Sequence, residues 1–306
     1  MANTPHKAPR IALIGLGLLG SSLGYALKKK NLAAHIAGAA QSPKTRARAL
    51  ELGFVDSVHS DIKEAVENAD IVFLNTPLNA MKDIVAQIAP HLKVGAILTD
   101  VGSAKSCVID DLAPLLPDTI ALVPAHPIAG TEETGPDAGF AELFEERWCI
   151  LTPPDNTPQA AIDVVADLWK NIGCTTTFMD AQTHDLILAL TSHIPHLIAY
   201  NLVGLAATLE SDMGDDIVRY SAGGFRDFTR ITASDPIMWR DIFLRNKGAV
   251  LDMLGRFNAD LAKLEVALRN DDADYLQSML TRAQDMRPRI IAAGQDTALP
   301  NFGRKK

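Results

Sequence analysis

The sequence contains little of what several classes of protein require. It has only three cysteines, Cys107, Cys149 and Cys174, and their spacing fits neither a disulfide framework nor a C-x-x-C metal motif. Aromatic residues make up only 6% of the chain, which argues against a platform that stacks nucleic-acid bases. The 29 Lys and Arg are outnumbered by 37 Asp and Glu, so the net charge of −8 offers no general cationic face to nucleic acid.

Signals for export or membrane insertion are also missing from the sequence. No uninterrupted apolar run reaches about 18 residues, so no membrane span is predicted. Residues 1–10 are polar and contain Pro5 and Pro9, unlike the apolar core of a signal peptide. We therefore expect a cytoplasmic protein with reduced thiols and a small-molecule substrate.

The chain changes character near residue 180. Before it, short apolar runs alternate with helical segments, which is the pattern of βαβ units around a parallel sheet. The predicted strands are Arg10–Ile14, His35–Ala40, Ile71–Asn75, Ala96–Asp100, Ile120–Val123 and Cys149–Thr152, all in one sheet, with Thr175–Met179 as a further strand. The predicted helices between them are Leu18–Lys30, Pro43–Leu52, Asn79–Leu92, Ala104–Leu116 and Pro158–Ile172.

After Asp180, a predicted N-cap, only helical patterns remain. They cover Ala181–Leu209, Pro236–Phe257, Ala259–Leu268 and Asp272–Ala292, and the polar tail Gly294–Lys306 is expected to be loosely docked. The 306 residues suit about two domains. We predict an α/β protein with an N-terminal Rossmann-type parallel-sheet domain, residues 1–180, and an all-helical C-terminal domain, residues 181–306.

A glycine-rich loop follows the first predicted strand and opens the first predicted helix. Its residues Gly15, Leu16, Gly17, Leu18, Leu19 and Gly20 fit G-x-G-x-x-G in the context that identifies a dinucleotide site. The first glycine permits a tight turn, the second lets the backbone approach a pyrophosphate, and the third allows close helix packing. The alternative is a glycine-rich turn without a ligand. Thr76 and Asp100, at the ends of two other strands, are expected to join this coenzyme site.

The end of the second strand lacks the acid that usually binds the ribose 2′-hydroxyl of NAD. The residues there are Gly38-Ala39-Ala40-Gln41-Ser42, followed by the cations Lys44, Arg46 and Arg48. This composition favours NADP, or the use of both NADP and NAD, with Gln41, Ser42 and Lys44 as contacts. In the alternative interpretation the three cations are only the solvated face of a helix.

A histidine stands between two prolines after the predicted strand Ile120–Val123. Pro124 and Pro127 hold the backbone extended around His126, and a rigid histidine at a sheet edge suits general acid–base chemistry. A structural histidine is the alternative. Ser103, at the end of another strand, can bind an imidazole or a coenzyme ribose, or can cap the following helix.

Two further motifs lie in the helical half. His193 and His196 are three residues apart and share a helix face, and Pro195 between them should kink the helix. A zinc site there is conceivable, but further ligands with suitable spacing are lacking. The segment Gly223–Arg230 offers arginine forks for a substrate carboxylate, unless Asp227 pairs internally with Arg226 or Arg230.

Together these motifs resemble the prephenate/arogenate (cyclohexadienyl) dehydrogenase family of tyrosine biosynthesis. The matching segments, in the family's order, are Gly15–Gly20, Thr99–Ser103, His126–Glu132, Ser192–His196, Gly223–Arg230 and Ser234–Arg240. The resemblance implies a Rossmann domain followed by a helical domain that forms a homodimer. The sequence departs from many NAD-using relatives at Ala40 and Gln41, where they have an acid.

The resemblance also implies roles for individual residues. His126 would act on the substrate's ring hydroxyl with Ser103 as its hydrogen-bond partner, and His196 with Arg230 would lie near the side-chain carboxylate. The remaining residues expected around the substrate are His193, Thr131, Glu132 and Asp227, with Trp239 near the subunit contact.

The expected reaction is NAD(P)-dependent oxidative decarboxylation of prephenate, with arogenate as a second substrate. Prephenate is favoured because the His196 imidazole can donate to its keto oxygen, whereas no acid beside it would bind the ammonium of arogenate. One alternative is a 3-hydroxyacid dehydrogenase, which would need a lysine in the helical domain. Another is a non-catalytic NADPH sensor, which would not need a rigid His126.

Overall fold

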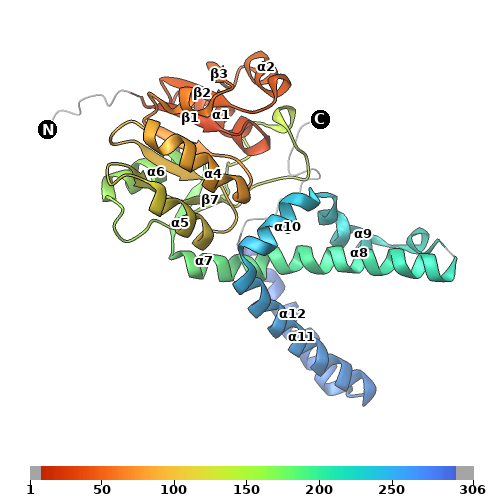
Figure 1. Ribbon diagram of the computed structural model, residues 1–306. Coiled ribbons are helices and arrows are strands. Elements are labelled where there is room, and N and C mark those ends of the chain that lie inside the picture. The colour runs from red at the N-terminus through yellow and green to blue at the C-terminus, as the bar shows by residue number, and fades with distance from the viewer. Residues whose placement is uncertain (1–7, 215, 294–306) are drawn as a thin grey trace.

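The computed structural model describes residues 8–214 and 216–293 and has two parts of different architecture (Figure 1). The N-terminal part contains a six-stranded sheet with strand order β3-β2-β1-β4-β5-β6, in which every pair is parallel. Its strands are β1 (Arg10–Ile14), β2 (His35–Ala39), β3 (Ser57–His59), β4 (Ile71–Leu74), β5 (Ile97–Asp100) and β6 (Ala121–Leu122). This strand order confirms the predicted Rossmann-type domain.

Two apolar cores lie on the two faces of this sheet. Successive side chains of a strand point to opposite faces, so Leu13 joins one core and Ala12 the other. On the first face, Trp169 packs edge-on against Phe73 and Phe144. The connecting helices are α1 (Leu18–Lys29), α2 (Pro43–Leu52), α3 (Ile62–Val66), α4 (Leu78–Ile88), α5 (Ser106–Leu112) and α6 (Gln159–Asn171). Strand β3 and helix α3 were not predicted, because both are short and only weakly patterned.

A second sheet corrects the predicted strand order. The expectation that Cys149–Thr152 extends the main sheet is wrong, because β8 (Trp148–Leu151) lies between β7 (Ala125–Pro127) and β9 (Thr175–Phe178) in a separate three-stranded sheet. Pro124 has no N–H with which to continue the main ladder beyond β6. Its carbonyl accepts from Thr152 N–H at 3.0 Å instead, and β7 pairs antiparallel with β8.

Within residues 181–214 and 216–293 the C-terminal part contains helices and their connecting turns but no strands, in agreement with the prediction. Asp180 caps it as expected, because its carboxylate accepts from Thr183 N–H at 2.8 Å. The helices are α7 (Ala181–Leu188), a π-helical turn (Ala189–His193), α8 (Ile194–Met213), α9 (Gly223–Thr229), α10 (Pro236–Arg245), α11 (Lys247–Arg269) and α12 (Ala273–Ala292). The tail Gly294–Lys306 lies outside the described residues.

Two irregularities in these helices have local causes. Pro195 cannot donate to the carbonyl of Thr191, and the wider π turn Ala189–His193 occurs where that bond would form. The predicted helix Pro236–Phe257 is wrong because the break falls at Asn246. The Asn246 side chain is buried and donates to the backbone of α7 instead of facing solvent.

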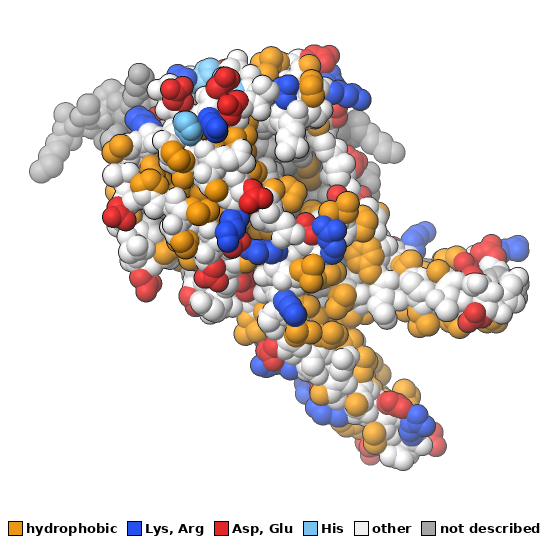
Figure 2. Space-filling view, in the orientation of Figure 1, with side chains coloured by type: hydrophobic (Ala, Val, Ile, Leu, Met, Phe, Trp, Pro, Cys, Tyr) orange, Lys and Arg blue, Asp and Glu red, His pale blue; other side chains and the backbone are white. Residues whose placement is uncertain are grey.

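Two arms of the helical part extend away from the sheet domain (Figure 1). One is α8, and the other consists of α11 and α12 lying side by side. Figure 2 shows hydrophobic side chains exposed along both arms, and on α8 they include Leu205, Leu209 and Met213. The helical segment Ala181–Met213, 33 residues long, is apolar and long enough to cross a membrane, and 28% of its most apolar stretch is buried.

The glycine loop provides a test of packing in the N-terminal domain. A Cβ atom on Gly20 would lie 2.1 Å from the Gly15 carbonyl oxygen, whereas one on Gly17 would meet nothing within 4 Å. We expect Gly20→Ala to lower the free energy of unfolding by about 1–3 kcal/mol through overpacking. The control Gly17→Ala should change it by less than about 0.5 kcal/mol. Urea unfolding of the ligand-free protein measures both, and equal effects would contradict the close helix–strand approach.

Candidate active site

The glycine loop forms an open cradle at the end of β1. Gly15 has a φ of +97°, which favours glycine, and its N–H donates to the Ala39 carbonyl at 2.9 Å. Helix α1 then begins after Gly17 with no side-chain cap and no acid in its first turn. The open space above Gly17 and the uncapped helix start suit a bound pyrophosphate. Leu16 is buried, so it can contribute only its backbone to a ligand, whereas Leu18 and Leu19 are half-buried and pack against the core.

Unpartnered polar atoms lie beside this loop. Asn75 Oδ1 and Thr76 Oγ1 are buried and have no hydrogen-bond partner among the described residues. Both residues adjoin Gly15, whose added Cβ would lie 2.4 Å from the Asn75 carbonyl oxygen. Buried polar atoms in folded proteins nearly always have partners. Together with the cradle, these orphaned atoms fit a bound dinucleotide. Thr76, which was expected at the coenzyme, lies beside the glycine loop.

The three cations that follow β2, Lys44, Arg46 and Arg48, differ in the groups that they contact. Arg48 is occupied, with Nη2 2.6 Å from Asp137 and Nη1 2.7 Å from Glu51. Arg46 Nη1 donates to the carbonyl oxygens of Ala40 at 2.6 Å and Gln41 at 2.8 Å, so its charge lies where an NAD-specific acid would stand. Ser42 caps α2, while Gln41 and Lys44 are exposed. The helix-face interpretation therefore applies to Arg48 but not to Arg46.

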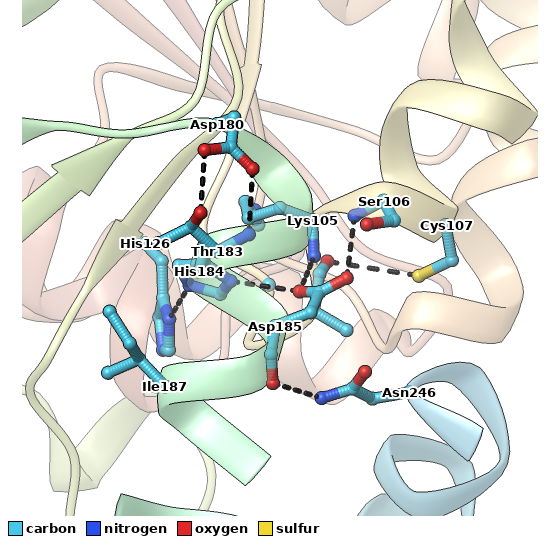
Figure 3. Close-up of polar contacts among 12 residues, drawn as sticks. Lys105, Ser106, Cys107, His126, Asp180, Thr183, His184, Asp185, Ile187 and Asn246 are labelled. Atoms are coloured by element: carbon cyan, nitrogen blue, oxygen red, sulfur yellow. Dashed lines mark hydrogen bonds and ion pairs between the residues drawn. The ribbon is translucent and has the colours of Figure 1, made fainter. Parts of the chain in front are cut away.

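His126 lies on β7 with only 8% of its surface exposed. Its Nδ1 is 2.8 Å from Nε2 of His184, a residue of α7 (Figure 3). Burial, with the nearby His184 and Lys105, holds the pKa of His126 well below its usual value. The ring is therefore neutral at pH 7, which is the state that a general base needs.

Among the described residues Ser103 neither bonds His126 nor caps a helix, and its expected contact with a coenzyme ribose stays a prediction. Within residues 8–214 and 216–293, no hydrogen bond joins it to His126, whose Nδ1 lies instead against His184. Nor does it cap a helix, since α5 begins only at Ser106, with Lys105 at the cap position. Ser103 is half-buried in the loop that connects β5 to α5.

A buried ion pair joins this loop to β7. Lys105 and Asp100 are both fully buried, with Nζ 2.5 Å from Oδ2. Lys105 Nζ also donates to the Ala125 carbonyl at 2.9 Å, and Asp100 Oδ2 accepts from Gly102 N–H at 2.7 Å. These added hydrogen bonds offset part of the cost of burying two charges. Asp100, expected at the coenzyme, is thus engaged in fixing the backbone beside His126.

His193 and His196 are held in different environments. His193 is fully buried and accepts at Nδ1 from Asn246 Nδ2 at 3.1 Å, which leaves its Nε2 buried and unpartnered among the described residues. Burial lowers the pKa of His193 to about 4. His196 stacks on Trp239 with ring centroids 3.6 Å apart and donates from Nδ1 to the Ser192 carbonyl at 2.9 Å. Burial, and to a lesser degree the charge of Arg230, lowers its pKa as well.

The other expected substrate residues lie on the surface of the chain. Arg230 is exposed at the end of α9, close enough for its charge to act on His196. Asp227 is exposed, with Oδ1 3.6 Å from Arg226 Nε, so the internal ion pair considered from sequence is present. Thr131 and Glu132 are in the loop after β7, where Thr131 Oγ1 accepts from Glu133 N–H. Among the described residues, no hydrogen bond joins Asp227, Thr131 or Glu132 to His126.

Sequence reasoning missed four residues that surround His126 and His193. His184 and Asp185 carried a usable signal, because an adjacent histidine and acid stand in the first turns of a helix whose cap, Asp180, was recognised. Lys105 and Asn246 carried none, since nothing local to either residue predicts its burial.

A dinucleotide cradle after β1 and a neutral, buried histidine on β7 are typical of a two-domain nicotinamide-dependent dehydrogenase. Comparison with known proteins narrows this class. Residues 23–177 match the nucleotide-binding domain of prephenate dehydrogenase, and residues 180–282 match its dimerization domain. The chain belongs to the prephenate/arogenate dehydrogenase family, which confirms the expected family and NAD(P) as its class of coenzyme.

Individual relatives cover nearly the whole chain. Cyclohexadienyl dehydrogenase of Zymomonas mobilis is 47% identical over 279 residues, which are 90% of this chain and 94% of that protein. Prephenate dehydrogenase of Bacillus subtilis is 33% identical, over 95% of this chain and 78% of that protein. The crystal structure of prephenate dehydrogenase from A. aeolicus with hydroxyphenyl propionate and NAD+ has a TM-score of 0.88 at 30% identity, covering 94% of this chain and 100% of that one.

Proposed function

We propose that this protein catalyses the NAD(P)-dependent oxidative decarboxylation of prephenate, and of arogenate, in tyrosine biosynthesis. Residues 1–180 bind the coenzyme, and residues 181–306 complete the substrate site. The observation that carries the proposal is the neutral imidazole of His126, buried beside the end of β5 and backed by His184. The family relationship supports the choice of substrate.

A coenzyme held at the loop Gly15–Gly20 would supply the acceptor for the hydride that leaves C4 of the substrate ring. His126 takes the proton of the C4 hydroxyl, so that a carbonyl forms as the C–H bond breaks. The ring carboxylate then leaves as CO2, and its electron pair makes the ring aromatic, with a proton returning to the oxygen. Prephenate gives 4-hydroxyphenylpyruvate and arogenate gives tyrosine. The protein's task is to orient the ring and to move one proton.

The helical domain supplies the substrate's polar contacts. The unpartnered Nε2–H of His193 suits a substrate oxygen, because a buried donor without a partner is costly. Arg230 offers a forked donor to the side-chain carboxylate, and Ser103, Thr131, Glu132 and Asp227 complete the rim of the site. The rival 3-hydroxyacid dehydrogenase would need a lysine here. Within the described helical residues the lysines, Lys247 and Lys263, are both exposed.

We infer that NADP serves at least as well as NAD. No acid stands at Ala40 or Gln41 to repel a 2′-phosphate, and Arg46 and Lys44 supply positive charge there. The experiment that tests the proposed function is a two-by-two assay of coenzyme reduction with prephenate or arogenate and NAD or NADP. Absence of turnover in all four combinations would refute the function, and strict NAD selectivity would refute the inference about the coenzyme.

His126→Asn tests the proposed base. The variant keeps a polar side chain but cannot accept the hydroxyl proton, so kcat should fall by about 10²–10⁴. Coenzyme affinity, measured by fluorescence titration, should stay within about twofold, because His126 lies outside the glycine loop. A folded variant with nearly normal kcat would remove His126 from the mechanism.

The geometry of His196 changes the argument about substrate preference. Its Nδ1–H is used by the Ser192 carbonyl, so a neutral ring offers only a bare Nε2, which accepts hydrogen bonds. The expected donation to the keto oxygen of prephenate therefore needs the protonated ring. A neutral His196 instead suits the ammonium of arogenate, which supports the use of both substrates.

This difference predicts a pH-dependent choice of substrate. Because burial lowers the pKa of His196, its ring becomes protonated only at a pH below the range in which an ordinary histidine titrates. The ratio of kcat/KM for prephenate to that for arogenate should rise about three- to tenfold from pH 8 to pH 5, since one charged donor is gained and an ammonium is repelled. Because His126 acts on both substrates in the same way, the effect of its titration cancels in this ratio. The control His196→Asn should flatten the ratio, and a flat ratio in the wild type would contradict this role.

We further propose that the protein is a cytoplasmic homodimer whose partner chain covers the apolar faces of the arms. The family's dimerization domain spans residues 180–282, which include α8, all of α11 and the first half of α12. A second copy of the same helices presents the same apolar side chains, so each chain can bury the other's. This accounts for the apolar surface of Ala181–Met213 without a membrane.

Analytical ultracentrifugation without detergent tests the dimer. The wild type should sediment as two chains of 32.9 kDa each. Leu205→Glu on α8, where the side chain is 54% exposed, should weaken the dimer at least about 100-fold by burying a charge. The matched control Val94→Glu, 76% exposed on the sheet domain, should stay dimeric. A monomeric wild type, or one that sediments with membranes, would contradict the proposal.

A further inference from the structure

Three side chains form a buried line behind the proposed base. His126 Nδ1 lies 2.8 Å from His184 Nε2, and His184 Nδ1 lies 2.9 Å from Asp185 Oδ1 (Figure 3). His126 comes from β7, while His184 and Asp185 come from α7. All three residues are buried, so water does not compete for these contacts.

The far end of the line is fixed by the protein backbone. Asp185 Oδ1 accepts from Lys105 N–H at 2.7 Å, and Oδ2 accepts from Ser106 N–H at 2.9 Å. Burial raises the pKa of Asp185, but these hydrogen bonds and the one from His184 lower it overall. Asp185 therefore stays ionised near pH 7, and a carboxylate can only accept.

The direction of each hydrogen bond follows from that acceptor. His184 Nδ1 must carry a proton to donate to Asp185. Burial, opposed by Asp185, lowers the pKa of His184, so its ring is neutral and Nε2 is bare. The bare Nε2 of His184 accepts, and the proton between the two rings must then belong to Nδ1 of His126. A neutral ring carries one proton, which leaves His126 Nε2 bare.

We propose that His184 and Asp185 are positioning residues that lock His126 into the tautomer with a proton on Nδ1 and a free lone pair on Nε2. The proposal rests on the proposed function, in which Nε2 takes the C4 hydroxyl proton. In the other tautomer Nε2 carries hydrogen and has no lone pair for that proton. The line also stabilises the imidazolium that forms, because its Nδ1–H already points at a bare nitrogen backed by a carboxylate.

A matched pair of variants at His184 tests the positioning role. His184→Leu removes the acceptor, so His126 is free to adopt either tautomer, and kcat should fall by about 10²-fold with KM within about threefold. His184→Gln can place its amide oxygen near the former Nε2 and accept from Nδ1–H, so it should recover kcat to within about tenfold of wild type. If the leucine variant keeps wild-type kcat, or if glutamine is no better than leucine, the proposal is overturned.

The tautomer itself is read from the wild-type protein without substrate. Long-range ¹⁵N–¹H NMR of histidine-labelled enzyme distinguishes protonated from bare ring nitrogens, and His126→Asn assigns the signals. We expect a protonated Nδ1 and a bare Nε2, and a protonated Nε2 would overturn the proposal even if the His184 variants fail to fold. Because this measurement needs no turnover, it separates the proposal from the proposed function, which fails only in the two-by-two assay.

Discussion

Asp185 accepts hydrogen bonds from both domains and from the residue behind the proposed base. Its carboxylate binds the Lys105 and Ser106 N–H groups at the start of α5, and its backbone carbonyl binds Asn246 at the start of α11. The contacts with Lys105 and Asn246 are buried, so losing either would leave an uncompensated polar group in the interior. Asp185 therefore helps to fix where α7 packs on the sheet domain, how the His184 ring is oriented and where the chain breaks before α11.

The neutral state of the site's histidines is a second consequence of burial. His126, His184, His193 and His196 all have a lowered pKa, and in each case desolvation is the main cause. Neutral rings can accept as well as donate hydrogen bonds, which imidazolium ions cannot do. The buried positive charge beside His126 is that of Lys105, which is paired with Asp100.

Sequence predicts the parts of this structure whose causes are local. The turn at Gly15, the start of α1 and the Asp180 cap each depend on a few adjacent residues, and they were predicted correctly. The pairing of β8 with β7 depends on residues some 25 positions apart, as in Ala125 with Leu151, and was predicted wrongly. At the site, His126 was recognisable from its prolines. The partner of its Nδ1 was not, because His184 reaches it from 58 residues away.

The break at Asn246 gives the second arm the geometry of a lever. Helix α11 has 23 residues and is therefore about 35 Å long, so each degree of rotation at its start moves its far end by about 0.6 Å. Asn246 holds this pivot through one amide nitrogen that binds both Asp185 and His193. A contact that holds the far end of α11 in place therefore also restricts the angle at which the helix leaves Asn246.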